Sequence, residues 1–270
     1  MAHVEEPQVA PDCCTGCCST CSCTLERVRY FPRELLTADD MRVEQEYFRQ
    51  RLRRHNRYLH GWGIVCGATV EPAPTATQHW LVRVCPGLVI SPQGDEAMID
   101  DCVLLDLKTG MCQPEPCTVT WPCPPVGTMP NADQRRTVYV AVRYVECLTR
   151  PVRVPPAGCG CDAADCEYSR IRDSFELKVL WELPDAYEKA KKADEAWCKT
   201  VTALSPEAVR LHQWPTIPCP PCAHDPWVVI ATVTLPTSEK TDIKAGDISP
   251  KDRRALLPTQ ALQIGIMCMP

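Results

Sequence analysis

The chain has 270 residues, of which 45% are hydrophobic and 23% charged, and its formal net charge is −5 at pH 7. This composition is typical of a globular protein of one or two domains, and its acidic balance excludes nucleic acid as the expected partner. No apolar run approaches the roughly 20 residues that span a bilayer, so we expect no membrane span.

Residues 1–24 form an arm that is rich in cysteine and proline and has few apolar groups to bury. Its order must come from cross-links, a metal ion or a partner. The beginning of the arm lacks the basic and apolar regions of a signal peptide. We therefore expect synthesis in the cytoplasm, with an extracellular location after release in the assembled state.

Six cysteines of this arm lie close enough in sequence for pairs of them to share a metal ion or to enter disulfides. Thiolates suit zinc, copper and iron–sulfur clusters, and disulfides are the favoured alternative. Adjacent cysteines bond poorly to each other, so their partners must lie elsewhere. The six are Cys13, Cys14, Cys17, Cys18, Cys21 and Cys23.

Residues 25–62 form the predicted helical segment. Thr37 and Asp40 have the spacing of a capping box, so a helix is expected to begin between them. Acidic residues come early and arginines late, which favours the helix dipole at both ends. Gly61 and Gly63 are expected to end the helix. The buried stripe at helical spacing is predicted to be Met41, Phe48, Leu52 and Leu59.

Residues 63–270 are predicted to form a β-rich domain with a second helix near 184–204. Short apolar or alternating runs separated by proline- and glycine-containing turns indicate strands. Because strands and helices do not alternate, we expect an α+β fold with a mainly antiparallel sheet. The predicted strands are 64–70, 80–84, 88–90, 103–107, 137–146, 175–181 and 227–235.

A second group of cysteines is the better zinc candidate, because two short knuckle-like segments could be joined by one ion. The alternative, which the sequence supports about equally, is two disulfides that cross-link loops. A redox dithiol is disfavoured, because no strand–CxxC–helix context surrounds the C-P-P-C motif. The candidate ligands are Cys159, Cys161, Cys166, Cys219, Cys222 and His224.

His55 and His60 invite a catalytic or metal-binding interpretation, but residues five apart do not share a face of an α-helix. Polar groups that bond neighbouring carbonyls at a helix end are the favoured interpretation. The sequence contains no P-loop, G-x-S-x-G or H-E-x-x-H motif. We therefore expect the protein not to be an enzyme.

The segment 30–67 reads YFPRELLTADD…EQEYF…RHNRYLHGWGIVCG and resembles a bacterial family associated with phage-tail-like contractile injection systems and related large assemblies. The similarity continues through Cys85–Leu88, Val142–Cys147, Cys166–Arg170 and Trp227–Thr234. The resemblance implies a structural role and brings no catalytic residues with it.

Two functional hypotheses result. The first is a non-enzymatic structural subunit of a large bacterial extracellular assembly, either phage-tail-like or filamentous, stabilised by disulfides or a structural metal ion. Its partners would be copies of itself or other subunits. The alternative is a metal-binding protein in which a copper, iron–sulfur or zinc centre is the function.

Overall fold

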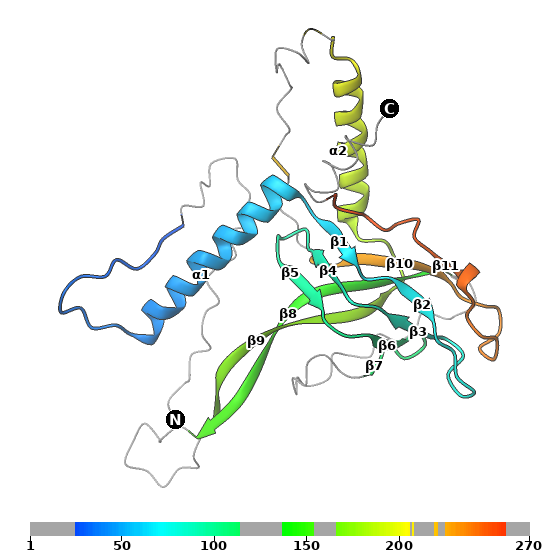
Figure 1. Cartoon of the computed structure of the whole chain (residues 1–270), viewed down its shortest axis with the longest axis horizontal. Helices are drawn as coiled ribbons and strands as arrows, with labels where there is room; N and C mark the ends of the chain where they lie inside the picture. Colours follow the sequence, from blue (N-terminus) through cyan, green and yellow to red (C-terminus); the bar gives the residue numbers. More distant parts are fainter. Residues whose placement is uncertain are drawn as a thin grey trace, which may run out of the picture. The chain divides into compact units, whose positions relative to one another are not determined.

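The computed structural model describes residues 25–113, 137–153, 166–205, 207, 219–220 and 225–257 (Figure 1). The chain divides into two compact units. The first comprises Met1–Gly61, Pro92–Asp95 and Pro184–Pro226, and the second comprises Trp62–Ser91, Glu96–Leu183 and Trp227–Pro270. Helices combine with strands that pair in antiparallel ladders, so the predicted α+β class is confirmed.

The first unit contains helix α1, Ala38–His55, which begins at the predicted capping box. The Thr37 hydroxyl accepts a hydrogen bond from the Asp40 amide at 3.2 Å, and the Asp40 carboxylate accepts one from the Thr37 amide at 2.8 Å. The hydroxyl of Thr37 also donates to this carboxylate, and these hydrogen bonds lower the pKa of Asp40. Two amides at the helix start that lack partners within the helix are thereby satisfied.

Helix α1 continues directly into a π-helical turn, η1, Asn56–His60. Gly61 ends it with a φ of 80°, a conformation that glycine adopts without steric cost. The Gly61 amide donates to the Asn56 carbonyl at 2.9 Å, which is the i to i+5 hydrogen bond of a π-turn. The predicted helix end at Gly61 is confirmed, but the wider last turn was not predicted.

Helix α2, Asp185–Thr202, confirms the second predicted helix. Tyr187 is buried, and Ala190, Trp197 and Val201 are partly buried on its less exposed side, as their helical spacing predicts. Among the described residues, no helix is both long and apolar enough to cross a membrane.

The second unit is built from three antiparallel sheets, with strand orders β1-β4-β5, β2-β3-β6-β7 and β11-β10-β8-β9. Every predicted strand is present, but the predicted strand 64–70 is divided into β1 and β2, and β5, β7 and β11 are additional. The strands β8 and β9 are also longer than predicted. A 3₁₀ turn, η2 (Ala245–Asp247), precedes the last strand. The strands are β1 Gly63–Gly67, β2 Val70–Pro72, β3 Leu81–Val84, β4 Gly87–Ile90, β5 Glu96–Ile99, β6 Val103–Asp106, β7 Cys112–Gln113, β8 Thr137–Arg153, β9 Cys166–Leu180, β10 Val228–Thr234 and β11 Ile248–Ser249.

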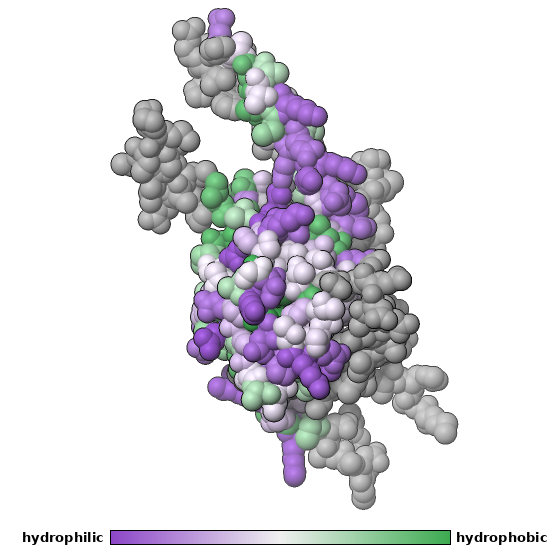
Figure 2. Space-filling model, turned by 90° about the vertical axis from the view of Figure 1, so that its right-hand side faces the viewer, coloured by the Kyte–Doolittle hydropathy of each residue, from purple (hydrophilic) through white to green (hydrophobic). Residues whose placement is uncertain are grey.

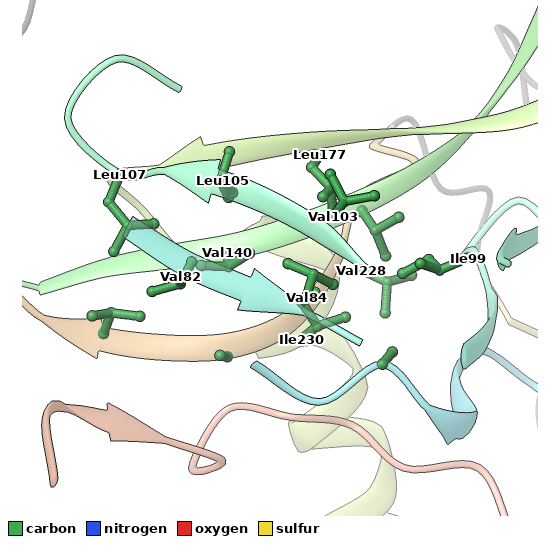
Figure 3. Packing of buried hydrophobic residues seen from close by; sticks show 14 of the residues in the cluster. Val82, Val84, Ile99, Val103, Leu105, Leu107, Val140, Leu177, Val228 and Ile230 are labelled. Atoms are coloured by element: carbon green, nitrogen blue, oxygen red, sulfur yellow. The ribbon is translucent and has the colours of Figure 1, made fainter. Parts of the chain in front are cut away.

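All three sheets contribute to one hydrophobic core in this unit (Figure 3). Val82 of β3, Val140 of β8 and Val228 of β10 have no exposed surface. Each fully buried side chain of this kind contributes about 1.5–3 kcal/mol to folding. β-Branched residues dominate the core because they pack well on a pleated surface.

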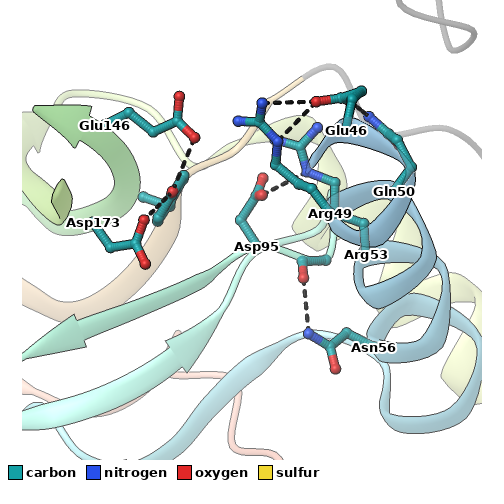
Figure 4. Close-up of polar contacts among 10 residues, drawn as sticks. Glu46, Arg49, Gln50, Arg53, Asn56, Asp95, Glu146 and Asp173 are labelled. Atoms are coloured by element: carbon teal, nitrogen blue, oxygen red, sulfur yellow. Dashed lines mark hydrogen bonds and ion pairs between the residues drawn. The ribbon is translucent and has the colours of Figure 1, made fainter. Parts of the chain in front are cut away.

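Strands β8 and β9 form a long two-stranded ribbon whose pairing runs from Tyr139↔Leu180 to Arg153↔Cys166. The end of the ribbon near Tyr139 and Leu180 packs on the core, and the end near Arg153 and Cys166 is largely exposed. Where burial begins, the Tyr144 hydroxyl donates to Asp173 at 2.6 Å and lies 3.3 Å from Glu146 (Figure 4). Burial raises the pKa of Tyr144, and the hydrogen bond to Asp173 raises it further. The phenol therefore stays protonated and links the two strands.

Two glycines allow the backbone of β1 to approach that of β4. Gly67 has a φ of 57°, and a Cβ atom at Gly87 would lie 2.1 Å from the Ala68 nitrogen. The carbonyls of Gly67 and Ala68 accept hydrogen bonds from the guanidinium of Arg253, which also donates to the Ile230 carbonyl. Burial lowers the pKa of Arg253. One side chain thus joins the end of β1 to β10.

Candidate functional site

The polar side of helix α1 contacts the loop Pro92–Asp95 of the same unit (Figure 4). Arg53 donates to the Asp95 carboxylate at 2.6 Å, and this carboxylate side chain is only 8% exposed. The buried Asn56 amide donates to the Gly94 carbonyl at 2.9 Å. A Cβ atom at Gly94 would lie 2.3 Å from the Arg53 carbonyl oxygen, so glycine is required for this close approach.

The hydrophobic side of α1 is exposed. Met41, Phe48 and Leu52 are 46%, 56% and 49% exposed, and Leu59 beyond the helix is 70% exposed. The predicted burial of these four residues is therefore wrong. The physical reason is that the contacts of α1 with the loop are made by the polar side chains of Arg53 and Asn56 and not by these hydrophobic ones. We call Met41, Phe48 and Leu52 the apolar stripe.

Exposed hydrophobic side chains of this size are the most informative feature of the surface of α1. On the face of the molecule that Figure 2 shows, which is the right-hand side of Figure 1, hydrophobic residues in green lie among hydrophilic ones in purple. A single exposed leucine needs no explanation, but three large side chains at spacings of seven and four residues form a contiguous strip. Such strips are typical of helices that pair with another helix.

Charge is distributed unevenly along the same helix. Asp39 and Asp40 lie in its first turn, whereas Arg53, Arg54 and His55 lie in its last turn. This distribution agrees with the helix dipole, as the sequence predicts. It also gives the apolar stripe an acidic end and a basic end.

His55 and His60 lie next to each other at the end of α1. Their Nε2 atoms are 3.3 Å apart, and the ring centroids are separated by 5.1 Å. The expectation that the two residues do not share a face is wrong, because the π-helical turn brings residues five apart into register. Both side chains are exposed.

Most predicted metal ligands lie outside the described residues. Cys166 begins β9 and Cys219 belongs to the first unit; both are exposed and carry free thiols. Within the described part of the chain, no group of three or more His, Cys, Asp or Glu residues is arranged to hold a metal ion. The predicted ligands outside it are Cys13, Cys14, Cys17, Cys18, Cys21, Cys23, Cys159, Cys161, Cys222 and His224.

Two further cysteines form a pair that sequence reasoning missed. Val84 of β3 pairs with Val103 of β6, so the next residues along the ladder, Cys85 and Cys102, lie opposite each other. Both thiols are free. Desolvation raises the pKa of Cys102, and the charge of Cys85 and a hydrogen bond with it raise it further. The proximity of these two cysteines could be inferred only once the register of β3 and β6 was known.

Mild oxidation is expected to join Cys85 to Cys102. With oxidised glutathione as the electron acceptor, the two thiols lose two electrons and two protons and form one S–S bond. Cross-strand neighbours have Cβ atoms about 4.5–5.5 Å apart, so little movement is needed to reach disulfide geometry. Closing a loop of this length is expected to stabilise the protein by about 3 kcal/mol relative to the Cys102→Ser variant.

Peptide mapping after trapping with N-ethylmaleimide measures this bond. The exposed thiol of Cys198 in α2 provides the internal control and should remain alkylated. Full alkylation of both Cys85 and Cys102 after oxidation would contradict the prediction.

Comparison with known proteins gives little guidance. No family model matches the sequence, and no curated protein matches it. Among solved structures, a chain from the crystal structure of TssK aligns with 84% of this chain at 10% identity, with a TM-score of 0.38. The chain spans only 41% of the length of that TssK chain. We draw no functional argument from this likeness.

Proposed function

We propose that this protein is a non-enzymatic structural subunit of a large bacterial, phage-tail-like assembly, and that it pairs with a second copy of itself through helix α1. The exposed apolar stripe of α1 carries this proposal. The helix is 18 residues long, is firmly capped and contains no buried residue. It presents hydrophobic side chains that would lose contact with water only against a partner.

Charge complementarity favours a second copy as that partner, in antiparallel orientation. In this arrangement the acidic first turn of one α1 lies beside the basic last turn of the other, and both apolar stripes face each other. A parallel arrangement would place like charges together, which is destabilising. The contact is isologous, as in most homodimers.

The expected strength of this contact suits a repeating assembly. Each stripe residue is about half exposed, so its burial would contribute about 1 kcal/mol, or about 6 kcal/mol for both copies. Association costs at least about 4 kcal/mol in lost freedom of motion, so the apolar stripes alone leave about 2 kcal/mol. The opposite charges at the two ends of the pair are expected to add about 2 kcal/mol, which gives a dissociation constant of about 1 mM. Within an assembly, further contacts raise the effective concentration and make such pairs stable.

The sequence resemblance of residues 30–67 to a family associated with phage-tail-like contractile injection systems supports the same role. This segment includes the whole of α1 and the π-helical turn. The motif that carries the resemblance therefore coincides with the helix that carries the apolar stripe.

Sedimentation equilibrium of the full chain tests the proposal. A reducing buffer is used so that intermolecular disulfides play no part. We expect a reversible monomer–dimer equilibrium at protein concentrations of up to about 500 µM, the range in which weak pairs become measurable. A protein that stays monomeric throughout this range would overturn the proposal.

Salt distinguishes the two orientations of the pair. Raising the ionic strength from about 0.1 M to 1 M shortens the Debye length from about 10 Å to about 3 Å. Antiparallel pairing joins opposite charges, so we expect salt to weaken the dimer. A dimer that salt strengthens would indicate the parallel orientation and would contradict the antiparallel one.

A further inference from the structure

The two histidines at the end of α1 are spaced as two ligands of one metal ion would be. Two nitrogens that each lie about 2.0–2.1 Å from one ion at a tetrahedral angle are about 3.3 Å apart, and their ring centroids are about 5 Å apart. The observed values for His55 and His60 are 3.3 Å between the Nε2 atoms and 5.1 Å between the centroids.

The backbone holds this geometry in place. His55 is the last residue of α1 and His60 the last residue of the π-helical turn, so both rings stand on continuous helical structure. The Gly61 amide closes the turn on the Asn56 carbonyl, and the Asn56 side chain is fixed by the Gly94 carbonyl. The backbone positions of the two histidines are therefore set before an ion arrives, which lowers the entropy cost of binding, although both side chains are exposed.

We propose that His55 and His60 bind a late first-row divalent metal ion, represented by Zn²⁺, through their two Nε2 atoms. Neutral imidazole is a good ligand for these ions. Without an ion, the 3.3 Å contact requires one ring to be the Nε2–H tautomer and to donate to the other Nε2. When the ion binds, this ring takes the Nδ1–H tautomer, so both neutral rings offer a free Nε2. Two coordination positions remain for water or another small ligand.

The surroundings limit the strength of the site. Arg54 and Arg57 lie close by in sequence, and their positive charges oppose a bound cation. Exposure to solvent screens this repulsion but does not remove it. The ion therefore binds moderately, and an anionic ligand in an open position strengthens the site. This inference does not depend on self-association of the chain.

Isothermal titration of the full chain with Zn²⁺ tests the site. The free thiols are first blocked with N-ethylmaleimide, so that the cysteines do not compete for the ion. We expect one Zn²⁺ to bind at the histidine pair, and His55→Gln or His60→Gln to weaken this binding at least tenfold. His79→Gln is the matched control, because His79 is paired with Asp242 in the second unit and should leave the affinity unchanged.

Nitrogen NMR of the histidine rings locates the ion directly. Zn²⁺ should shift the Nε2 resonances of His55 and His60 together and leave those of His79 in place. Both histidines are exposed, so circular dichroism should show intact helices in every variant. Equal Zn²⁺ affinity in all variants, or unshifted Nε2 resonances, would overturn the proposal.

Discussion

Replacing Phe48 and Leu52 by glutamine is expected to abolish measurable self-association. Both side chains are about half exposed in the free chain, so each contributes about 1 kcal/mol when a partner covers it. The symmetric pair contains four of them, so the double variant loses about 4 kcal/mol, or roughly a thousandfold in dissociation constant. Sedimentation equilibrium measures the loss.

Val43→Gln is the matched control for this experiment. Val43 is an apolar residue of the same helix and is 43% exposed, but it lies about 140–180° around the helix from Phe48 and Leu52. Glutamine is a good helix former and adds no charge, so helicity should be retained in all variants. If Val43→Gln weakens the dimer as strongly as the double variant, the contact does not use the apolar stripe.

Replacing Gly87 by alanine is expected to destabilise the second unit by at least about 3 kcal/mol. The new methyl group would lie 2.1 Å from the Ala68 nitrogen and 2.6 Å from the Cys66 carbonyl oxygen. These are backbone atoms, so no side chain can rotate away to make room, and β1 must separate from β4. Urea denaturation followed by tryptophan fluorescence gives the change in the free energy of unfolding.

Gly246→Ala is the control for backbone entropy alone. A Cβ atom at Gly246 meets nothing within 4 Å, and its φ is not in the left-handed region. This variant should be neutral or slightly stabilising, because alanine restricts the unfolded chain. A Gly87→Ala protein as stable as Gly246→Ala would show that β1 and β4 do not approach as closely as described.

Local sequence signals predicted the elements of the fold well. The capping box at Thr37, the second helix and all seven predicted strands depend on short-range patterns of polarity and on residues that end elements. Strands β5, β7 and β11 were missed, because four residues in β5 and two in each of the others are too few for an alternating pattern to be recognised. The contact of α1 with the loop Pro92–Asp95 and the order of the strands within the sheets could not be predicted from the sequence.

The candidate sites depended on longer-range information. The hydrophobic period of α1 identified Met41, Phe48 and Leu52 as one face, but assigned that face to the interior. A period gives the faces of a helix and does not say which one finds a partner. The proximity of Cys85 to Cys102 likewise required the register of β3 and β6.

The sequence by itself determined the type and approximate position of the two helices and the main strands, since capping, periodicity and turn residues act over a few positions. Only the tertiary structure decided that α1 turns its charged side to the Gly94–Asp95 loop, and that a π-turn brings two imidazoles together. The physical reason is that a contact between distant residues is selected by the total free energy of packing. Here the Arg53–Asp95 ion pair and the Asn56–Gly94 hydrogen bond join α1 to the loop, and three large hydrophobic side chains of the helix stay exposed.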